Sequence, residues 1–137
     1  MTHCNNILRA AIVIPIITIA SLAHAQLFSF DGLQYHVLSQ EEATVETYYG
    51  GKGIPGGHFD VPEKVTDTSG KVYTVVQIGW YSFQNTSITS ITLPPTIREI
   101  RTAAFTKCPL TEIHFPAGVR SIDGVAFSGC NGLHDAR

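Results

Sequence analysis

Histidine and carboxylate side chains that could bind a metal ion stand in two pairs with the same spacing. His58 is followed two positions later by Asp60, and Glu112 is followed two positions later by His114. Residues two apart on an extended strand point to the same side, so each pair offers two ligands from one face. A further strand is expected between the two pairs, which places them about 10 Å apart. That separation is too great for one Zn²⁺ ion with ligands at about 2.0 Å, so we expect exposed strand residues and no metal site.

The sequence lacks the motifs of nucleophilic, metalloprotease and nucleotide-binding chemistry. No His-Glu-x-x-His, Gly-x-Ser-x-Gly or Cys-x-x-Cys occurs in it. The glycine-rich segment 50–57 lacks the Gly-Lys-Ser/Thr of a phosphate-binding loop and is interpreted as a turn of a capping element. An enzyme such as a small hydrolase therefore has little support, and we expect neither catalytic residues nor a cofactor.

Composition indicates one folded domain without a nucleic-acid-binding face. The chain has 137 residues, of which 44% are hydrophobic, so it can bury a core. Charged residues make up only 15%, below the roughly 25% that is typical of soluble domains. The net charge of −2 argues against nucleic-acid binding, which depends on basic residues that neutralise phosphates.

The first 25 residues have the three regions of a secretory signal peptide. Arg9 is the only charged residue among them, residues 10–20 are almost entirely apolar, and Ala23 and Ala25 form an A-x-A cleavage site. The alternative is a retained membrane anchor, but a helix of that apolar length rises only about 16 Å, short of the hydrocarbon core of about 30 Å. We therefore expect a secreted or cell-surface protein that has no contact with the membrane after cleavage.

The second half of the chain repeats itself at a spacing of 22 residues. The recurring apolar residues are Val75, Ile97 and Val119; Ile78, Ile100 and Ile122; and Phe83, Phe105 and Phe127. A unit of this length cannot bury its own apolar face, but stacked copies bury one another's, which predicts a solenoid. Residues 88–93 and 110–115 fit L-x-x-L-x-L, the strand segment of a leucine-rich repeat. Pro94 and Pro116 end these strands, and the rest of each unit is expected to be a tight turn with a short second strand.

The residues before the repeats are typical of the cap that such an array requires. Apolar and polar residues alternate around Asp31-Gly32, which predicts a β-hairpin, and residues 44–49 can add a strand. Phe59-x-Val61-Pro62 has the pattern of the later strands, so a degenerate first repeat is expected there, followed by a hydrophilic turn at 67–71. The expected organisation is a signal peptide (1–25), a β cap with the degenerate repeat (26–74), and repeats (75–137), two of them complete and the third incomplete.

The repeating units resemble the BspA-like (Treponema pallidum-type) leucine-rich repeats of bacterial and some protist cell surfaces. That family has the pattern Ile-Gly-x-x-Ala-Phe-x-x-Cys-x-x-Leu-x-x-Ile-x-x-Pro. The matching residues are Ile78-Gly79 and Phe83; Ile100, Ala104-Phe105 and Cys108; and Ile122, Ala126-Phe127 and Cys130. The departures are Ser82 for Ala, Thr86 for the first Cys, and Arg101 and Asp123 for Gly. The resemblance covers 75–137 and implies a mainly β solenoid that serves in secreted or cell-surface recognition, often adhesion, without catalytic residues.

Six polar residues stand between the buried positions of the expected strands. They are His58 and Asp60, Ser90 and Thr92, and Glu112 and His114. Alternation along a strand sends them to the face opposite the core, and a stacked array provides an extended concave surface. We expect this face to bind a protein or glycan ligand. The alternative is a structural fragment of a larger surface protein.

Two cysteines occupy the same position in successive units, Cys108 and Cys130. Stacking brings them near each other, and a backbone separation of about 5 Å allows a disulfide. Solenoids more often place a column of small buried side chains at such a position, as Thr86 does one unit earlier. The sequence leaves open whether these residues form a disulfide or a column of buried thiols.

The third unit ends early, which predicts an open end of the array. After Leu133 only Ala136 stands where an apolar strand residue is expected, so Ile113 and Phe115 would have little above them. We therefore expect a truncated array that is marginally stable and self-associates through its uncapped C-terminal end, residues 110–137.

Overall fold

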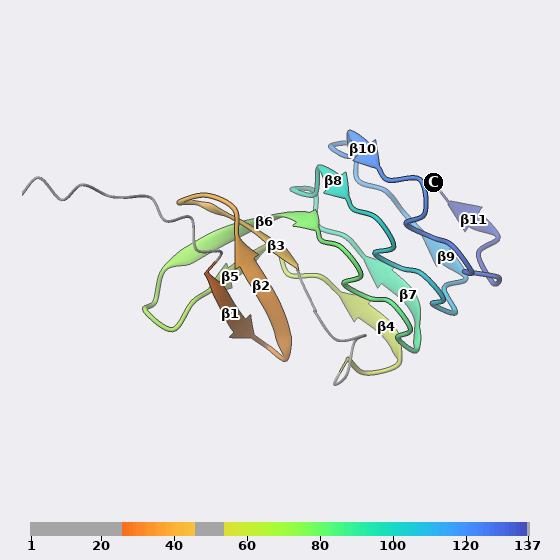
Figure 1. Ribbon diagram of the computed structural model, residues 1–137, viewed down its shortest axis with the longest axis horizontal. Helices are drawn as coiled ribbons and strands as arrows, with labels where there is room; N and C mark the ends of the chain where they lie inside the picture. Colours follow the sequence, from red (N-terminus) through yellow and green to blue (C-terminus); the bar gives the residue numbers. More distant parts are fainter. Residues whose placement is uncertain (1–25, 46–53, 137) are drawn as a thin grey trace, which may run out of the picture.

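The computed structural model describes residues 26–45 and 54–136, and these residues form two β-sheets (Figure 1). The signal peptide expected in 1–25 and the first half of the glycine-rich segment, 50–53, lie outside the described residues. The first sheet has the order β1-β2-β3-β6-β8-β10, with β5 pairing β6 to one side, and the second has the order β11-β9-β7-β4. Among residues 26–45 and 54–136 no helix occurs, and therefore none that could cross a membrane.

The strands of the first sheet are β1 (Leu27–Phe30), β2 (Leu33–Val37), β3 (Glu42–Val45), β5 (Lys64–Thr66), β6 (Val72–Ile78), β8 (Glu99–Ile100) and β10 (Ser121–Ile122). Those of the second sheet are β4 (Gly57–Asp60), β7 (Ile88–Thr92), β9 (Glu112–Ile113) and β11 (Asp135–Ala136).

The repeats form the predicted solenoid, in which equivalent residues of successive units lie side by side. In the first sheet Ile78 pairs with Ile100 and Ile100 with Ile122, all in parallel strands. In the second sheet Ile91 pairs with Ile113 in the same way. Each unit therefore contributes one strand to each sheet, and the turns between them stack in Figure 1. The 22-residue period of the sequence is thus the length of one coil.

A column of phenylalanine rings runs through the core between the two sheets. The rings of Phe83 and Phe105 stack at 5.3 Å between centroids, and those of Phe105 and Phe127 stack at 5.1 Å. Phe59, from the degenerate first repeat, lies tilted against Phe83 at 5.7 Å. Such aromatic pairs each contribute about 0.5–1.5 kcal/mol beyond the burial of their area. The column therefore ties each unit to the next.

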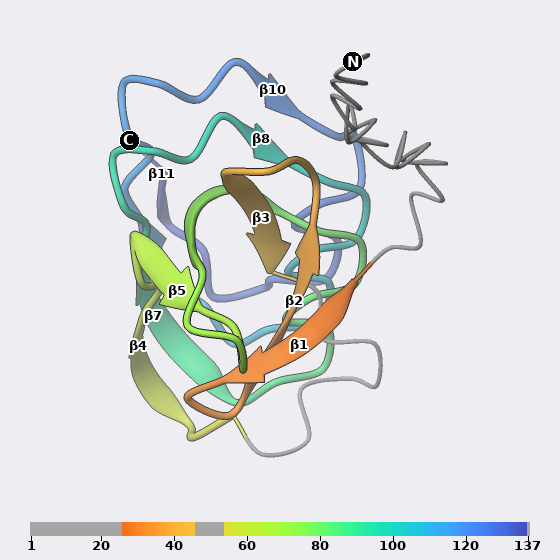
Figure 2. The same cartoon turned by 90° about the vertical axis from the view of Figure 1, so that its left-hand side faces the viewer.

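The N-terminal cap contains the predicted hairpin and closes one end of the array. β1 and β2 pair through Phe30 and Leu33 around a turn in which Asp31 and Gly32 both have positive φ (46° and 78°). A turn of this kind matches the twist of the two strands. β3 then pairs antiparallel with β2 and parallel with β6, so the cap adds strands to the first sheet. Figure 2, viewed from this end, shows β1–β3 in front of the coils.

The third cap strand begins earlier than the sequence suggested, at Glu42 instead of Thr44. Residues 46–49 of the expected strand lie outside the described residues. The difference arises because Ala43 and Val45 are both buried, and Ala43 pairs with Val75 of β6.

The junction between cap and array explains two residues of the first unit. The Gly79 N–H donates to the Val45 carbonyl oxygen at 2.8 Å, and a Cβ at Gly79 would come within 2.6 Å of that oxygen. The hydroxyl of Ser82 lies 2.7 Å from the same carbonyl, in place of the alanine of later units. Gly79 and Ser82 therefore fit the Val45 end of the cap strand β3.

The C-terminal end is better covered than the sequence suggested. β11 forms and pairs with β9 through Asp135–Glu112 and Ala136–Ile113, and Leu133 packs against the core. Ile113 is consequently only 1% exposed, so the expectation that it would have little above it is wrong. Phe115 is half-buried and its ring meets that of Phe127 edge-on at 5.8 Å.

Candidate functional site

The six polar residues singled out in the sequence lie on adjacent strands of the second sheet. His58 pairs with Ser90, which pairs with Glu112, and Asp60 pairs with Thr92 in the parallel ladders. The neighbours Ile91 and Ile113 point into the core, as alternation along a strand requires. Ser90 is half-buried and the other five are exposed. We call this set, His58, Asp60, Ser90, Thr92, Glu112 and His114, the strand face.

One half of the strand face is held in place by a hydrogen-bond network around His58. Its Nδ1 lies 2.8 Å from the Ser90 hydroxyl, and its Nε2 lies 3.0 Å from an Asp60 carboxylate oxygen and 3.2 Å from the Thr92 hydroxyl. Hydrogen bonds from Thr92 and then from His58 hold the pKa of the Asp60 carboxyl below its usual value. The carboxylate therefore stays charged and the imidazole has a fixed orientation.

Serine, histidine and aspartate also occur together in hydrolytic enzymes, but this cluster lies on an open sheet. The side chains of His58 and Asp60 are 55% and 74% exposed, so water has free access to them. An enzyme strengthens charge stabilisation by excluding water from its site, which this surface does not do. The network is suited to presenting polar groups to a ligand.

The other half of the strand face, Glu112 and His114, has no such network. Both side chains are exposed, and neither takes part in a hydrogen bond or ion pair with any residue in the part of the chain that the structure describes. A carboxylate and an imidazole that have no internal partner are free to bond to an incoming molecule.

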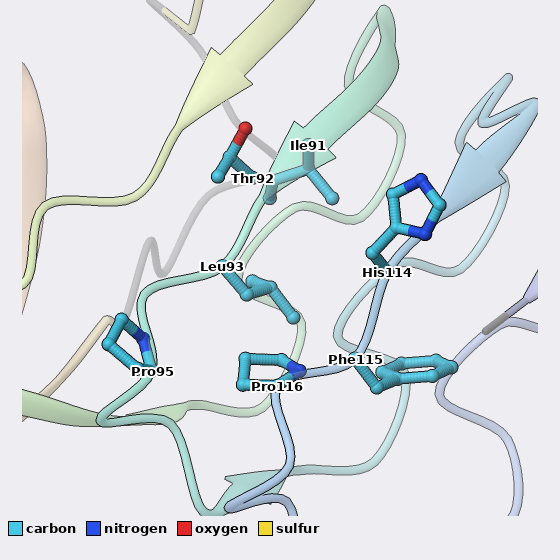
Figure 3. Close-up of a pocket in the computed structure, with 7 residues that line it drawn as sticks. All are labelled: Ile91, Thr92, Leu93, Pro95, His114, Phe115 and Pro116. Atoms are coloured by element: carbon cyan, nitrogen blue, oxygen red, sulfur yellow. The ribbon is translucent and has the colours of Figure 1, made fainter.

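A shallow pocket of about 260 Å³ adjoins this free half of the strand face (Figure 3). It is lined by Ile91, Thr92, Leu93, Pro95, His114, Phe115 and Pro116. Thr92 and His114 stand at its rim in Figure 3, with Leu93 between them. Two residues predicted for the binding face therefore border a largely apolar hollow.

The pocket forms where the ladder between β7 and β9 comes apart. One unit earlier, the Val61 N–H donates to the Thr92 carbonyl at 3.0 Å and continues the ladder past the end of β4. The equivalent bond from the Leu93 N–H to the His114 carbonyl is not made. Pro95 and Pro116 then turn the two chains without backbone donors of their own. The sequence predicted that Pro94 and Pro116 end the strands but gave no sign that the chains separate.

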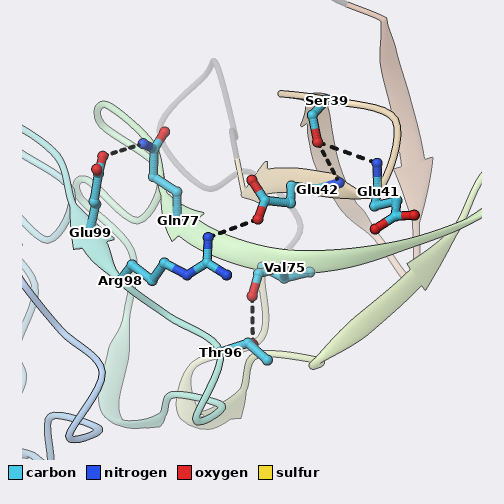
Figure 4. A network of polar contacts seen from close by, with 8 residues as sticks. All are labelled: Ser39, Glu41, Glu42, Val75, Gln77, Thr96, Arg98 and Glu99. Carbon is cyan, nitrogen blue, oxygen red and sulfur yellow. Dashed lines mark hydrogen bonds and ion pairs between the residues drawn. The ribbon is translucent and has the colours of Figure 1, made fainter.

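The charged residues on the strands of the second sheet are all acidic, whereas the first sheet carries charges of both signs, some of them paired. Strands β4, β7, β9 and β11 contain Asp60, Glu112 and Asp135 and no Lys or Arg. On the first sheet Arg98 bonds to Glu42 at 2.8 Å, and Glu99 accepts from Gln77 at 2.7 Å (Figure 4). Within the strand face, the Glu112 carboxylate has no partner of opposite charge among the residues that the structure describes.

The two cysteines are free thiols that hydrogen-bond along the array. The Cys108 thiol donates to the Phe83 carbonyl at 2.7 Å, and the Cys130 thiol donates to the Phe105 carbonyl at 3.0 Å. We call Cys108 and Cys130 the thiol column. One unit earlier, the Thr86 hydroxyl occupies the equivalent position and lies 3.3 Å from the Cys108 sulfur. Burial raises the pKa of both thiols, which keeps them protonated and able to donate. In this structure both cysteines are free thiols, Cys108 buried and Cys130 partly exposed.

Comparison with known proteins gives one family and several similar folds. The model of the family described as "BspA type Leucine rich repeat region (6 copies)" matches residues 60–137. A leucine-rich cell surface protein from Faecalibacterium prausnitzii is 27% identical with a TM-score of 0.69, over 80% of this chain and 30% of that one. A leucine-rich repeat protein from Bacteroides capillosus is 24% identical with a TM-score of 0.60, over 80% of this chain and 96% of that one.

The pneumococcal vaccine antigen PcpA has the same kind of fold, with a TM-score of 0.57 at 21% identity. This chain spans 38% of PcpA and 30% of the F. prausnitzii protein, so it corresponds to only part of each. No curated protein matches the sequence significantly.

Proposed function

Because the chain belongs to the BspA-type leucine-rich repeat family, we propose that it is an exported interaction module whose strand face binds a partner outside the cell. The similar protein from F. prausnitzii is described as a cell surface protein, and residues 1–25 have the pattern of a secretory signal peptide. Both support export to the surface or beyond it. The fold supports a role in recognition, since stacked repeats offer an extended surface.

The observation that carries this proposal is the contrast between the two halves of the strand face. Around His58 the polar groups are already bonded to one another, so their positions are set before a ligand arrives. Beside them the side chains of Glu112 and His114 have no partner among the described residues, and His114 borders the apolar pocket. Preorganised groups reduce the entropy lost on binding, while free polar groups and an apolar hollow supply new contacts.

The proposal is tested with arrays of extracellular-matrix proteins and of glycans, probed with the labelled chain purified after export. The test variant replaces Thr92, Glu112 and His114 together with alanine. The control variant replaces two exposed residues with alanine, Glu63 just before β5 and Thr68 in the β5–β6 turn of the cap. We expect binding to at least one arrayed molecule to fall about ten-fold or more in the test variant and to stay unchanged in the control. Unchanged binding by a folded test variant would refute the strand face as the binding surface.

A second candidate is a structural role within a larger surface protein. The observation that favours it is that the chain corresponds to only 30% and 38% of two of its structural relatives. A pulldown from the native cell surface separates the two candidates. Stable partner subunits without any bound ligand would favour the structural role.

A further inference from the structure

We propose that the pocket beside Thr92 and His114 holds a single apolar side chain of a protein partner, and that a lysine or arginine of the partner lies next to that side chain. The inference rests on the proposed function, because it names the partner's chemistry at the free half of the strand face.

The size and lining of the pocket fit one apolar side chain. At about 260 Å³ it is smaller than the 300–1,000 Å³ that is usual for sites of drug-sized ligands. Its walls are carbon-rich, from Leu93, Phe115 and two prolines, and its polar groups stand at the rim. A sugar, which carries hydroxyl groups all round, would leave several of them unbonded against these walls. An aliphatic or aromatic anchor in a small pocket is the common form of a binding hot spot between proteins.

The backbone at the pocket is able to bond to an extended peptide. The Leu93 N–H and the His114 carbonyl have lost the ladder bond that would join them, and Leu93 is only 7% exposed. A buried N–H without a partner is unfavourable, so an acceptor that reaches it stabilises the complex. A peptide group of a partner supplies both an acceptor and a donor for these two groups, which lie just beyond the paired residues of β7 and β9. This favours a protein segment with its side chain in the pocket.

The charge of the surrounding surface favours a positively charged residue of the partner beside the apolar side chain. The strands of this sheet contain three acidic residues and no basic one, and Glu112 has no partner of its own. Glu112 is two residues from His114 at the pocket rim, so a cation next to the anchor would lie within its reach. Opposite charges of this kind raise the association rate and disfavour acidic partners.

The experiment selects peptides from a phage-displayed random dodecapeptide library on the immobilised full chain. The proposal expects the selected peptides to carry Leu, Ile, Met or Phe within two positions of Lys or Arg. Their affinities are then measured for Thr92→Phe, which fills the pocket from its rim. We expect Thr92→Phe to weaken binding about ten-fold or more.

The charge is tested with Glu112→Gln, which we expect to weaken binding about three-fold at low salt and less at high salt. Glu63→Gln and Thr68→Phe, both at exposed positions of the cap, are the matched controls and should change nothing. Circular dichroism checks that each variant is folded.

The outcomes separate the pocket from the strand face. If selected peptides lose affinity for the Thr92, Glu112 and His114 triple alanine variant but not for Thr92→Phe, the pocket inference is wrong and the strand face stands. Peptides that bind the triple variant as well as the native chain would overturn both. Peptides without the apolar and basic signature, or glycan binding without peptide binding, would overturn the partner chemistry inferred here.

Discussion

Replacing Gly79 with alanine tests the contact between cap and array, where the structure allows the effect to be estimated. Gly79 has no positive φ, so alanine fits its backbone, and by conformational entropy alone the change would stabilise the protein by about 0.4–1 kcal/mol. The new Cβ, however, would lie 2.6 Å from the Val45 carbonyl oxygen, and a backbone atom cannot move aside cheaply. Overpacking of this kind costs about 1–3 kcal/mol.

Moving β3 away from Gly79 also weakens two hydrogen bonds to the Val45 carbonyl, from the Gly79 N–H and from the Ser82 hydroxyl. Each such bond contributes about 0.5–1.5 kcal/mol. We therefore expect Gly79→Ala to lower the free energy of unfolding by about 2 kcal/mol. With a urea m-value of about 2 kcal/mol/M, the midpoint falls by about 1 M.

The assay is urea unfolding followed by far-ultraviolet circular dichroism, because the single tryptophan is the next residue in the chain and its fluorescence would change for local reasons. Gly124→Ala is the matched control. A Cβ at Gly124 meets nothing within 4 Å and its φ is not positive, so this change should be neutral or slightly stabilising. A Gly79→Ala protein that is as stable as the native chain would refute the close approach of β3.

Three further predictions follow from other parts of the structure. The Cys108 thiol, which is buried, should react with a thiol reagent only after unfolding. Because the pKa values of Cys108 and Cys130 are raised, the stability they contribute is fully present below the unfolded value near 9 and is lost as the pH rises beyond it. A Cys108→Ala variant should therefore show a smaller loss of stability between about pH 8 and 9.5 in urea titrations at each pH. In an NMR titration the pKa of the Asp60 carboxyl should lie below its usual value and move back toward it in Thr92→Val; no movement would mean that the Thr92 hydrogen bond is not its main cause. Light scattering should show that the chain self-associates through the end of the array at which Ile122 is 42% exposed. Ile122→Glu should reduce this association, whereas Leu27→Glu, at an exposed position of the cap, should not. A monodisperse native monomer would contradict the prediction.

The repeat made most of the array predictable from the sequence. Because the spacing of 22 residues is kept at Ile78, Ile100 and Ile122, the register of the parallel strands follows from it directly. The hairpin at Asp31-Gly32 was predictable for a local reason, since the turn needs residues that accept positive φ. The placement of the strand face on neighbouring strands follows from the same period, while its binding role remains a prediction.

The features that the sequence did not reveal depend on contacts between distant segments. β3 joins β6 across about thirty residues, and no local pattern encodes that pairing. The pocket arises because the ladder opens between Leu93 and His114, which is a matter of backbone geometry beyond any motif. The burial of Ile113 was misjudged because a strand as short as β11, with only a small apolar residue, still covers its neighbour.

The junction at Gly79 and Ser82 also restricts the end of the array at which repeats can be gained or lost during evolution. These residues fit the cap strand β3, so the first unit cannot exchange places with the later ones, whose equivalent positions hold Arg101 and Ala104. Beyond the first unit the strands pair only with strands of neighbouring units, so duplication or loss of a 22-residue segment there preserves the ladder contacts, although Arg98 of the second unit also reaches back to Glu42 of the cap. Recombination can therefore lengthen or shorten the solenoid on the side away from the cap while the cap and its fitted first unit are inherited as one block.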